Sequence, residues 1–97
     1  METAAEQPDV FVRLGGLLVR LLGRKGVTPD MITPEASLTE DLGMDSFEFV
    51  DLTVAIESEF ALNRFPMQQW IDEERIRRSG RFDVGSLARR IQAERLA

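Results

Sequence analysis

Residues 38–60 have the sequence LTEDLGMDSFEFVDLTVAIESEF, and this stretch decides the fold. Its second part, from Asp45 to Phe60, predicts a helix because apolar residues recur there at helical spacing. Asp45 is expected to cap this helix, and Glu48, three residues later, completes a capping box. The preceding segment, Val27 to Met44, contains two prolines and few periodic signals. It predicts one long ordered loop. Loops of this length that contain no helix or strand are often functional.

The apolar residues of the predicted helix fall into two stripes. The first is a broad core face made of Phe49, Leu52, Thr53, Ile56 and Phe60. The second is a strip of three residues edged by the acids Glu48, Asp51 and Glu57, and we call it the apolar strip: Phe47, Val50 and Val54. A helix in a small bundle needs only one buried face, so the apolar strip is predicted to be exposed. The alternative is a helix that is buried on two sides.

Ser46 occupies the first turn of this helix, directly after the loop. The N–H groups and the positive dipole end at a helix start favour a phosphate there, and Gly43 permits a tight approach to that start. The sequence has no histidine, and no lysine or arginine lies between Gly26 and Asn63. No base is therefore expected to activate Ser46 as a nucleophile. We interpret Ser46 as an attachment point that another enzyme modifies.

Three further helices are expected, over residues 9–22, 66–78 and 84–95, and no segment predicts a strand. Asp9 and Asp83 are the predicted caps of the first and the last. The fold class is therefore all-α, a small antiparallel bundle of three main helices plus a shorter helix. Residues 8–97 are expected to form a single domain, and residues 1–7 a disordered N-terminus.

The composition excludes several kinds of function. The 97 residues include no cysteine and no histidine, which removes zinc fingers, thiolate nucleophiles and histidine-based catalysis. We expect no metal site and no enzymatic activity. Residues 26–63 contain nine acids and no base, whereas residues 64–97 contain eight arginines and five acids. An acidic surface attracts basic partners and repels nucleic acid.

The N-terminus and the hydropathy predict a location. The first residues are polar and acidic, unlike a signal peptide. No apolar run reaches the roughly 18 residues of a membrane span. We therefore expect a cytoplasmic protein that is not inserted in a membrane.

Residues 35–60 resemble the acyl carrier proteins of fatty-acid and polyketide synthesis. The pattern of that family is Gly-x-Asp-Ser-Leu, preceded by a leucine-containing phrase that leads from the loop into the helix. It is followed by an acidic and apolar helix that ends in Glu-Glu-Phe. The matching residues here are Gly43-Met-Asp-Ser-Phe47 and Glu57-Ser-Glu-Phe60. The resemblance is looser over residues 8–34 and 83–96.

This resemblance implies a cofactor and partners. Ser46 would take 4′-phosphopantetheine from coenzyme A through a phosphopantetheinyl transferase, in which Asp45 would help to position the metal and the substrate. The thiol of the arm would carry an acyl group as a thioester. The apolar strip would contact acyl-loading and acyl-processing enzymes that have basic docking patches. Four acids would pair with those patches: Glu48, Asp51, Glu57 and Glu59. The chain is expected to be a monomer.

Three departures from the family pattern refine this prediction. Phe47 replaces the usual leucine, which makes the partner surface bulkier, and Phe49 is larger than usual, which narrows any acyl cleft. The segment from Arg64 to Phe82 is longer and richer in arginine than in fatty-acid carriers, which indicates a specialised, free-standing carrier. Two alternatives remain open: a carrier-like interaction or regulatory domain that is never loaded, and an aminoacyl or peptidyl carrier.

Overall fold

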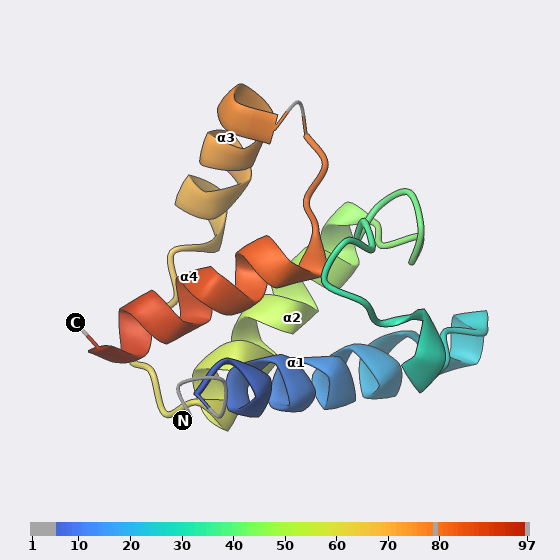
Figure 1. The fold of residues 1–97 in the computed structure, drawn as a ribbon, viewed down its shortest axis with the longest axis horizontal. Coiled ribbons are helices and arrows are strands. Elements are labelled where there is room, and N and C mark those ends of the chain that lie inside the picture. Colours follow the sequence, from blue (N-terminus) through green and yellow to red (C-terminus); the bar gives the residue numbers. More distant parts are fainter. Residues whose placement is uncertain (1–5, 79, 97) are drawn as a thin grey trace.

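The computed structural model describes residues 6–78 and 80–96, and this part of the chain forms four α-helices. They are α1 (Glu6–Leu22), α2 (Ser46–Glu59), α3 (Met67–Arg78) and α4 (Val84–Leu96), with short 3₁₀ helices η2 (Gly23–Lys25) and η3 (Pro29–Met31) after α1. In Figure 1, α1 runs opposite to α2 and α4, and α3 projects away from these three. The predicted all-α class is confirmed. The described helices include none that is long and apolar enough to cross a membrane.

The start of α1 differs from the prediction. The helix begins at Glu6, so Asp9 lies inside it and does not cap it. Pro8 does not prevent this because the first N–H groups of a helix have no partner within the helix, so a proline there loses no hydrogen bond. Asp9 accepts a hydrogen bond from Arg13 one turn later, at 3.4 Å. Residues 1–5 of the predicted disordered N-terminus lie outside the described residues.

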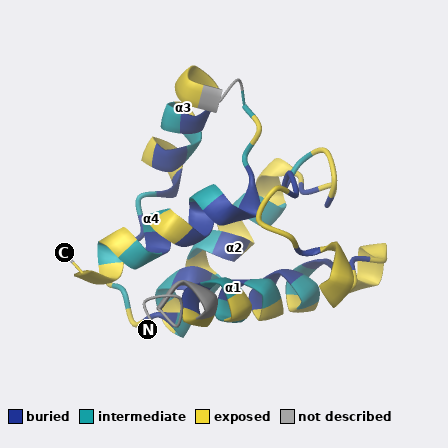
Figure 2. Ribbon diagram, in the orientation of Figure 1, coloured by how far each residue is buried: buried dark blue, intermediate teal, exposed yellow. Residues whose placement is uncertain are grey.

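The core lies between α1, α2 and α4 (Figure 2). From α1 it takes a stripe at helical spacing, Val10, Leu14, Leu17, Leu18 and Leu22. On α2, Leu52 and Ile56 are fully buried, while Phe49 and Thr53 on the same predicted core face are only half-buried. The predicted core face of α2 is thus confirmed at its centre, and its edge lies at the surface between α2 and α3.

The loop between α1 and α2 is held by the chain that leads into α4. The N–H of Leu38 donates to the carbonyl of Phe82 at 2.9 Å, and the N–H of Val84 donates to the carbonyl of Ala36 at 2.9 Å. Leu38 and Leu42 are buried, so their side chains anchor the loop in the core. These contacts fix the end of the loop, and with it the place where α2 begins.

A polar seam joins α3 to α4. Trp70 is buried, and its indole N–H donates to Ser86 Oγ at 3.1 Å. The same hydroxyl donates to Glu74 Oε2 at 2.6 Å. Pro66, the predicted first residue of this helix, lies just before α3, and its carbonyl accepts the N–H of Trp70 at 3.1 Å. The seam holds α3 to α4, which leaves the side of α3 that faces α2 to form one wall of a groove.

Candidate attachment site

The start of α2 is built by the predicted capping box. Asp45 Oδ1 accepts the N–H of Glu48 at 2.9 Å, and Glu48 Oε1 accepts the N–H of Asp45 at 3.0 Å. These two bonds leave the N–H groups of Ser46 and Phe47 without a hydrogen-bond partner in the described part of the chain. Ser46 itself is exposed. The helix therefore presents a hydroxyl beside two free N–H donors.

Gly43 contributes to this geometry for a different reason from the predicted one. Its φ is +72°, a left-handed conformation that side chains with a Cβ rarely adopt. A Cβ at this position would meet no atom within 4 Å. The predicted close approach is therefore wrong, and glycine is needed for its backbone conformation. The N–H of Gly43 donates to the carbonyl of Thr39 at 3.1 Å, which closes the last turn of the loop.

The structure adds one residue that the sequence analysis missed. The Nζ of Lys25, at the end of η2, donates to the carbonyl of Gly43 at 2.6 Å and to Glu48 Oε1 at 2.9 Å. Both of these hydrogen bonds run to residues close to Ser46 in the chain, Gly43 before it and Glu48 after it. Lys25 lies directly before residues 26–63, the segment that contains no lysine or arginine. The only feature of the sequence that points to Lys25 is the basic pair Arg24-Lys25, just after the first predicted helix.

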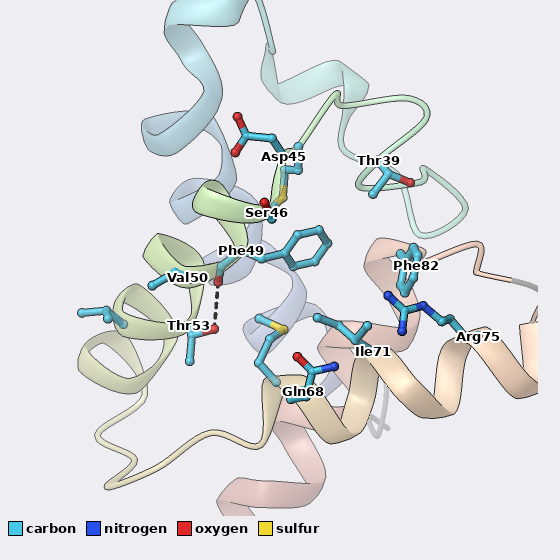
Figure 3. A pocket seen from close by; sticks show the side chains of 13 residues that line it. Thr39, Asp45, Ser46, Phe49, Val50, Thr53, Gln68, Ile71, Arg75 and Phe82 are labelled. Carbon is cyan, nitrogen blue, oxygen red and sulfur yellow. Dashed lines mark hydrogen bonds between the residues drawn. The ribbon is translucent and has the colours of Figure 1, made fainter.

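A groove of about 640 Å³ opens at Ser46 and runs between α2 and α3. In Figure 3, the Phe49 ring points from α2 across this groove toward Phe82. The two ring centres lie 6.2 Å apart in an edge-to-face arrangement. Phe49 thus occupies part of the groove, in agreement with its predicted narrowing effect. The other apolar lining residues are Met44, Val50, Val54, Met67 and Ile71.

The apolar strip is exposed, as predicted. Phe47, Val50 and Val54 have 80%, 63% and 61% of their surface exposed. The alternative of a helix buried on two sides is therefore wrong. Since Val50 and Val54 also line the groove, the strip forms one of its rims. The role of the strip in docking stays a prediction.

Most of the predicted docking acids already have partners within the chain. Glu48 binds Lys25, and Glu59 Oε2 accepts from Arg13 Nε at 3.0 Å. Glu57 Oε2 accepts the N–H of Phe65 at 2.9 Å and is half-buried. Asp51 is exposed. Among these four acids, Asp51 thus keeps the geometry expected of a docking residue.

The fold and the site define a small helical domain that presents a serine at the start of a helix. A family model described as "Phosphopantetheine attachment site" matches residues 13–72. The chain belongs to this family, whose members carry 4′-phosphopantetheine.

Similar proteins include three acyl carrier proteins. The chain is 43% identical over 44 residues to the acyl carrier protein AcpXL of Mesorhizobium japonicum. This match covers 45% of the chain and 46% of that protein. It is 39% identical over 57 residues to the acyl carrier protein of Saccharopolyspora erythraea, covering 59% of the chain and 57% of that protein. It is 43% identical over 54 residues to the acyl carrier protein of Petrotoga mobilis, and the match covers 56% of the chain and 60% of that protein. The chain spans about half the length of these curated relatives. No solved structure matches.

Proposed function

We propose that the protein is an acyl carrier protein in which Ser46 bears the 4′-phosphopantetheine arm. The arm supplies a thiol that holds an acyl group as a thioester. The observation that carries this proposal is the exposed hydroxyl of Ser46 at the start of α2, at the mouth of the groove. Membership of the phosphopantetheine attachment family supports it.

The residues at the start of α2 fit the phosphodiester of such an arm. A phosphate on Ser46 Oγ would lie beside the free N–H groups of Ser46 and Phe47, where the helix dipole also favours an anion. The nearby Lys25 is a bound cation and Asp45 is a cap, so neither activates the serine. We therefore infer that a phosphopantetheinyl transferase attaches the arm, and that the protein acts as a carrier and not as a catalyst.

The surroundings of Ser46 suit an acyl cargo and a partner enzyme. The groove has a mostly apolar lining and begins at the serine, so it suits an alkyl chain. The apolar strip lies on the adjacent exposed face of α2, with Asp51 beside it. We propose that acyl-loading and acyl-processing enzymes contact this face. The monomeric state and the cytoplasmic location stay predictions.

The test is the intact mass of the protein after incubation with coenzyme A and a broad-specificity phosphopantetheinyl transferase. The wild type is expected to gain the mass of one phosphopantetheine, and Ser46→Ala is expected to gain nothing. Ser58→Ala, which alters another exposed serine of α2, is the matched control and should be modified like the wild type. Unmodified wild type, under conditions that load a control carrier, would support the alternative of a domain that is never loaded.

A further inference from the structure

Lys25 joins three segments that meet just before Ser46. It is the last residue of η2, which follows α1 directly. Its ammonium binds the carbonyl of Gly43, in the last turn of the loop, and the carboxylate of Glu48, in the first turn of α2. The two distances are 2.6 and 2.9 Å. A single side chain therefore spans the junction from which Ser46 projects.

The ion pair between Lys25 and Glu48 involves the same carboxylate oxygen that accepts a hydrogen bond in the capping box. Glu48 Oε1 accepts both the ammonium of Lys25 and the N–H of Asp45, the latter at 3.0 Å. The carboxylate side chain is only 19% exposed, whereas that of Lys25 is 41% exposed. Hydrogen bonds between ionised groups are roughly twice as strong as neutral ones. Lys25 therefore fixes the carboxylate that closes the capping box around Ser46.

The contact with Gly43 restrains the most adaptable residue of the junction. Glycine loses more conformational freedom on folding than any other residue, and Gly43 holds a left-handed conformation. The hydrogen bond from Lys25 fixes the direction of its carbonyl group. Two residues link Gly43 to Ser46, so a rotation at Gly43 changes the direction in which the serine hydroxyl points. A modifying enzyme needs that direction to be fixed, because misorientation of a reacting group slows the reaction.

We propose that Lys25 is a positioning residue for the attachment of the arm. It acts through the Gly43 carbonyl and the Glu48 carboxylate, and it orients the hydroxyl of Ser46 toward the transferring enzyme. This inference rests on the proposed function, since it concerns the modification of the same serine.

The neighbouring residue Arg24 provides a matched control. Arg24 and Lys25 belong to the same 3₁₀ helix, and both line a hollow beside Glu48 and Asp51. Replacing either by methionine removes one positive charge from the same face, so a general effect of charge on the enzyme would change both variants alike. Of these two side chains, Lys25 donates to Gly43 and Glu48, whereas Arg24 makes no such bond within the described part of the chain. A positioning effect would therefore appear in the Lys25 variant alone.

The experiment measures kcat and KM of a broad-specificity phosphopantetheinyl transferase for four proteins: wild type, Lys25→Met, Arg24→Met and Lys25→Arg. We expect Lys25→Met to lower kcat by about ten- to a hundredfold, with a smaller change in KM. Arg24→Met should keep the kcat of the wild type. Lys25→Arg should restore most of the rate, since a guanidinium can donate to both oxygens. Melting temperatures measured in parallel show whether each variant is folded.

Glu48→Gln tests the same contact without changing Lys25. If the two residues act as one unit, the double variant with Lys25→Met should be as slow as the slower single variant. Equal kcat values for Lys25→Met and the wild type, or equal losses for Lys25→Met and Arg24→Met, would overturn the inference while leaving the proposed function intact. A wild type that is not modified at all would overturn the proposed function, and this inference with it.

Discussion

Truncation of the exposed aromatic ring of Phe47 separates a docking role from a structural one. Phe47 is 80% exposed, so folding removes only about a fifth of its surface from water. An aromatic side chain can bury roughly 200 Å², so about 40 Å² is at stake here. At about 25 cal/mol per Å², Phe47→Ala should lower the free energy of unfolding by about 1 kcal/mol at most. Alanine also favours the helix, which offsets part of this loss.

Ile56 provides the comparison on the opposite face of α2. It is fully buried, so Ile56→Ala loses both its transfer energy and the packing of its neighbours. The expected loss is about 2–5 kcal/mol. For a domain of this size, each 1 kcal/mol lowers the melting temperature by roughly 4–8 °C. The two variants should therefore be clearly separated by urea denaturation or by thermal melting.

The assay combines the denaturation midpoint with the rate at which the arm is attached. Phe47→Ala should keep a midpoint near that of the wild type and slow the modification, because the ring lies beside Ser46 on the exposed face of α2. If Phe47→Ala shifts the midpoint as much as Ile56→Ala, the apolar strip is part of the core and the reasoning fails. If it changes neither stability nor rate, the strip is exposed but does not serve docking.

Three further predictions concern single contacts. Gly43→Ala should destabilise the fold by about 1–2 kcal/mol in urea denaturation, because alanine strains the left-handed conformation in otherwise open space; an unchanged midpoint would contradict this. Glu74 is buried, and its Oε1 has no hydrogen-bond partner among the described residues. Glu74→Gln should therefore not destabilise the protein at pH 7, whereas Ser86→Ala, which removes its donor, should cost about 1–3 kcal/mol in the same assay. The hydrogen bond from Arg90 lowers the pKa of Glu73 below its ordinary value. This pair therefore stabilises the fold above the ordinary carboxyl pKa and is lost as the pH falls through the lowered value. Arg90→Gln should make the melting temperature depend less on pH in that acid range, and an unaltered dependence would argue against the pair.

The sequence by itself determined the elements whose stabilising contacts are local. The capping box joins Asp45 to Glu48, three residues apart, so both partners can be recognised in one short window. The period of the apolar residues likewise separated the exposed strip from the buried Leu52 and Ile56. These features depend on helix geometry alone, because residues three or four positions apart always share a helix face.

Helix boundaries were less determined by the sequence. Asp9 has the side chain of a cap, yet the helix starts at Glu6, since neither Pro8 nor Asp9 prevents a helix from starting before them. At the other end of the chain, Asp83 Oδ1 accepts the N–H of Ser86 at 2.9 Å, as expected for the predicted cap of α4. An aspartate is therefore a cap at the start of α4 but lies inside α1, because the residues before Asp9 are themselves helical.

Only the tertiary structure decided which acidic residues around the site are paired with basic residues. Residues 26–63 carry nine acids and no base in sequence, but the fold brings Lys25 to Glu48 and Arg13 to Glu59. The second of these pairs joins residues 46 positions apart. The position of α3, which creates the groove beside Ser46, is set in the same way by the part-buried hydrogen bond from Trp70 to Ser86. Such contacts depend on how helices pack against one another, and no local pattern in the sequence encodes that packing.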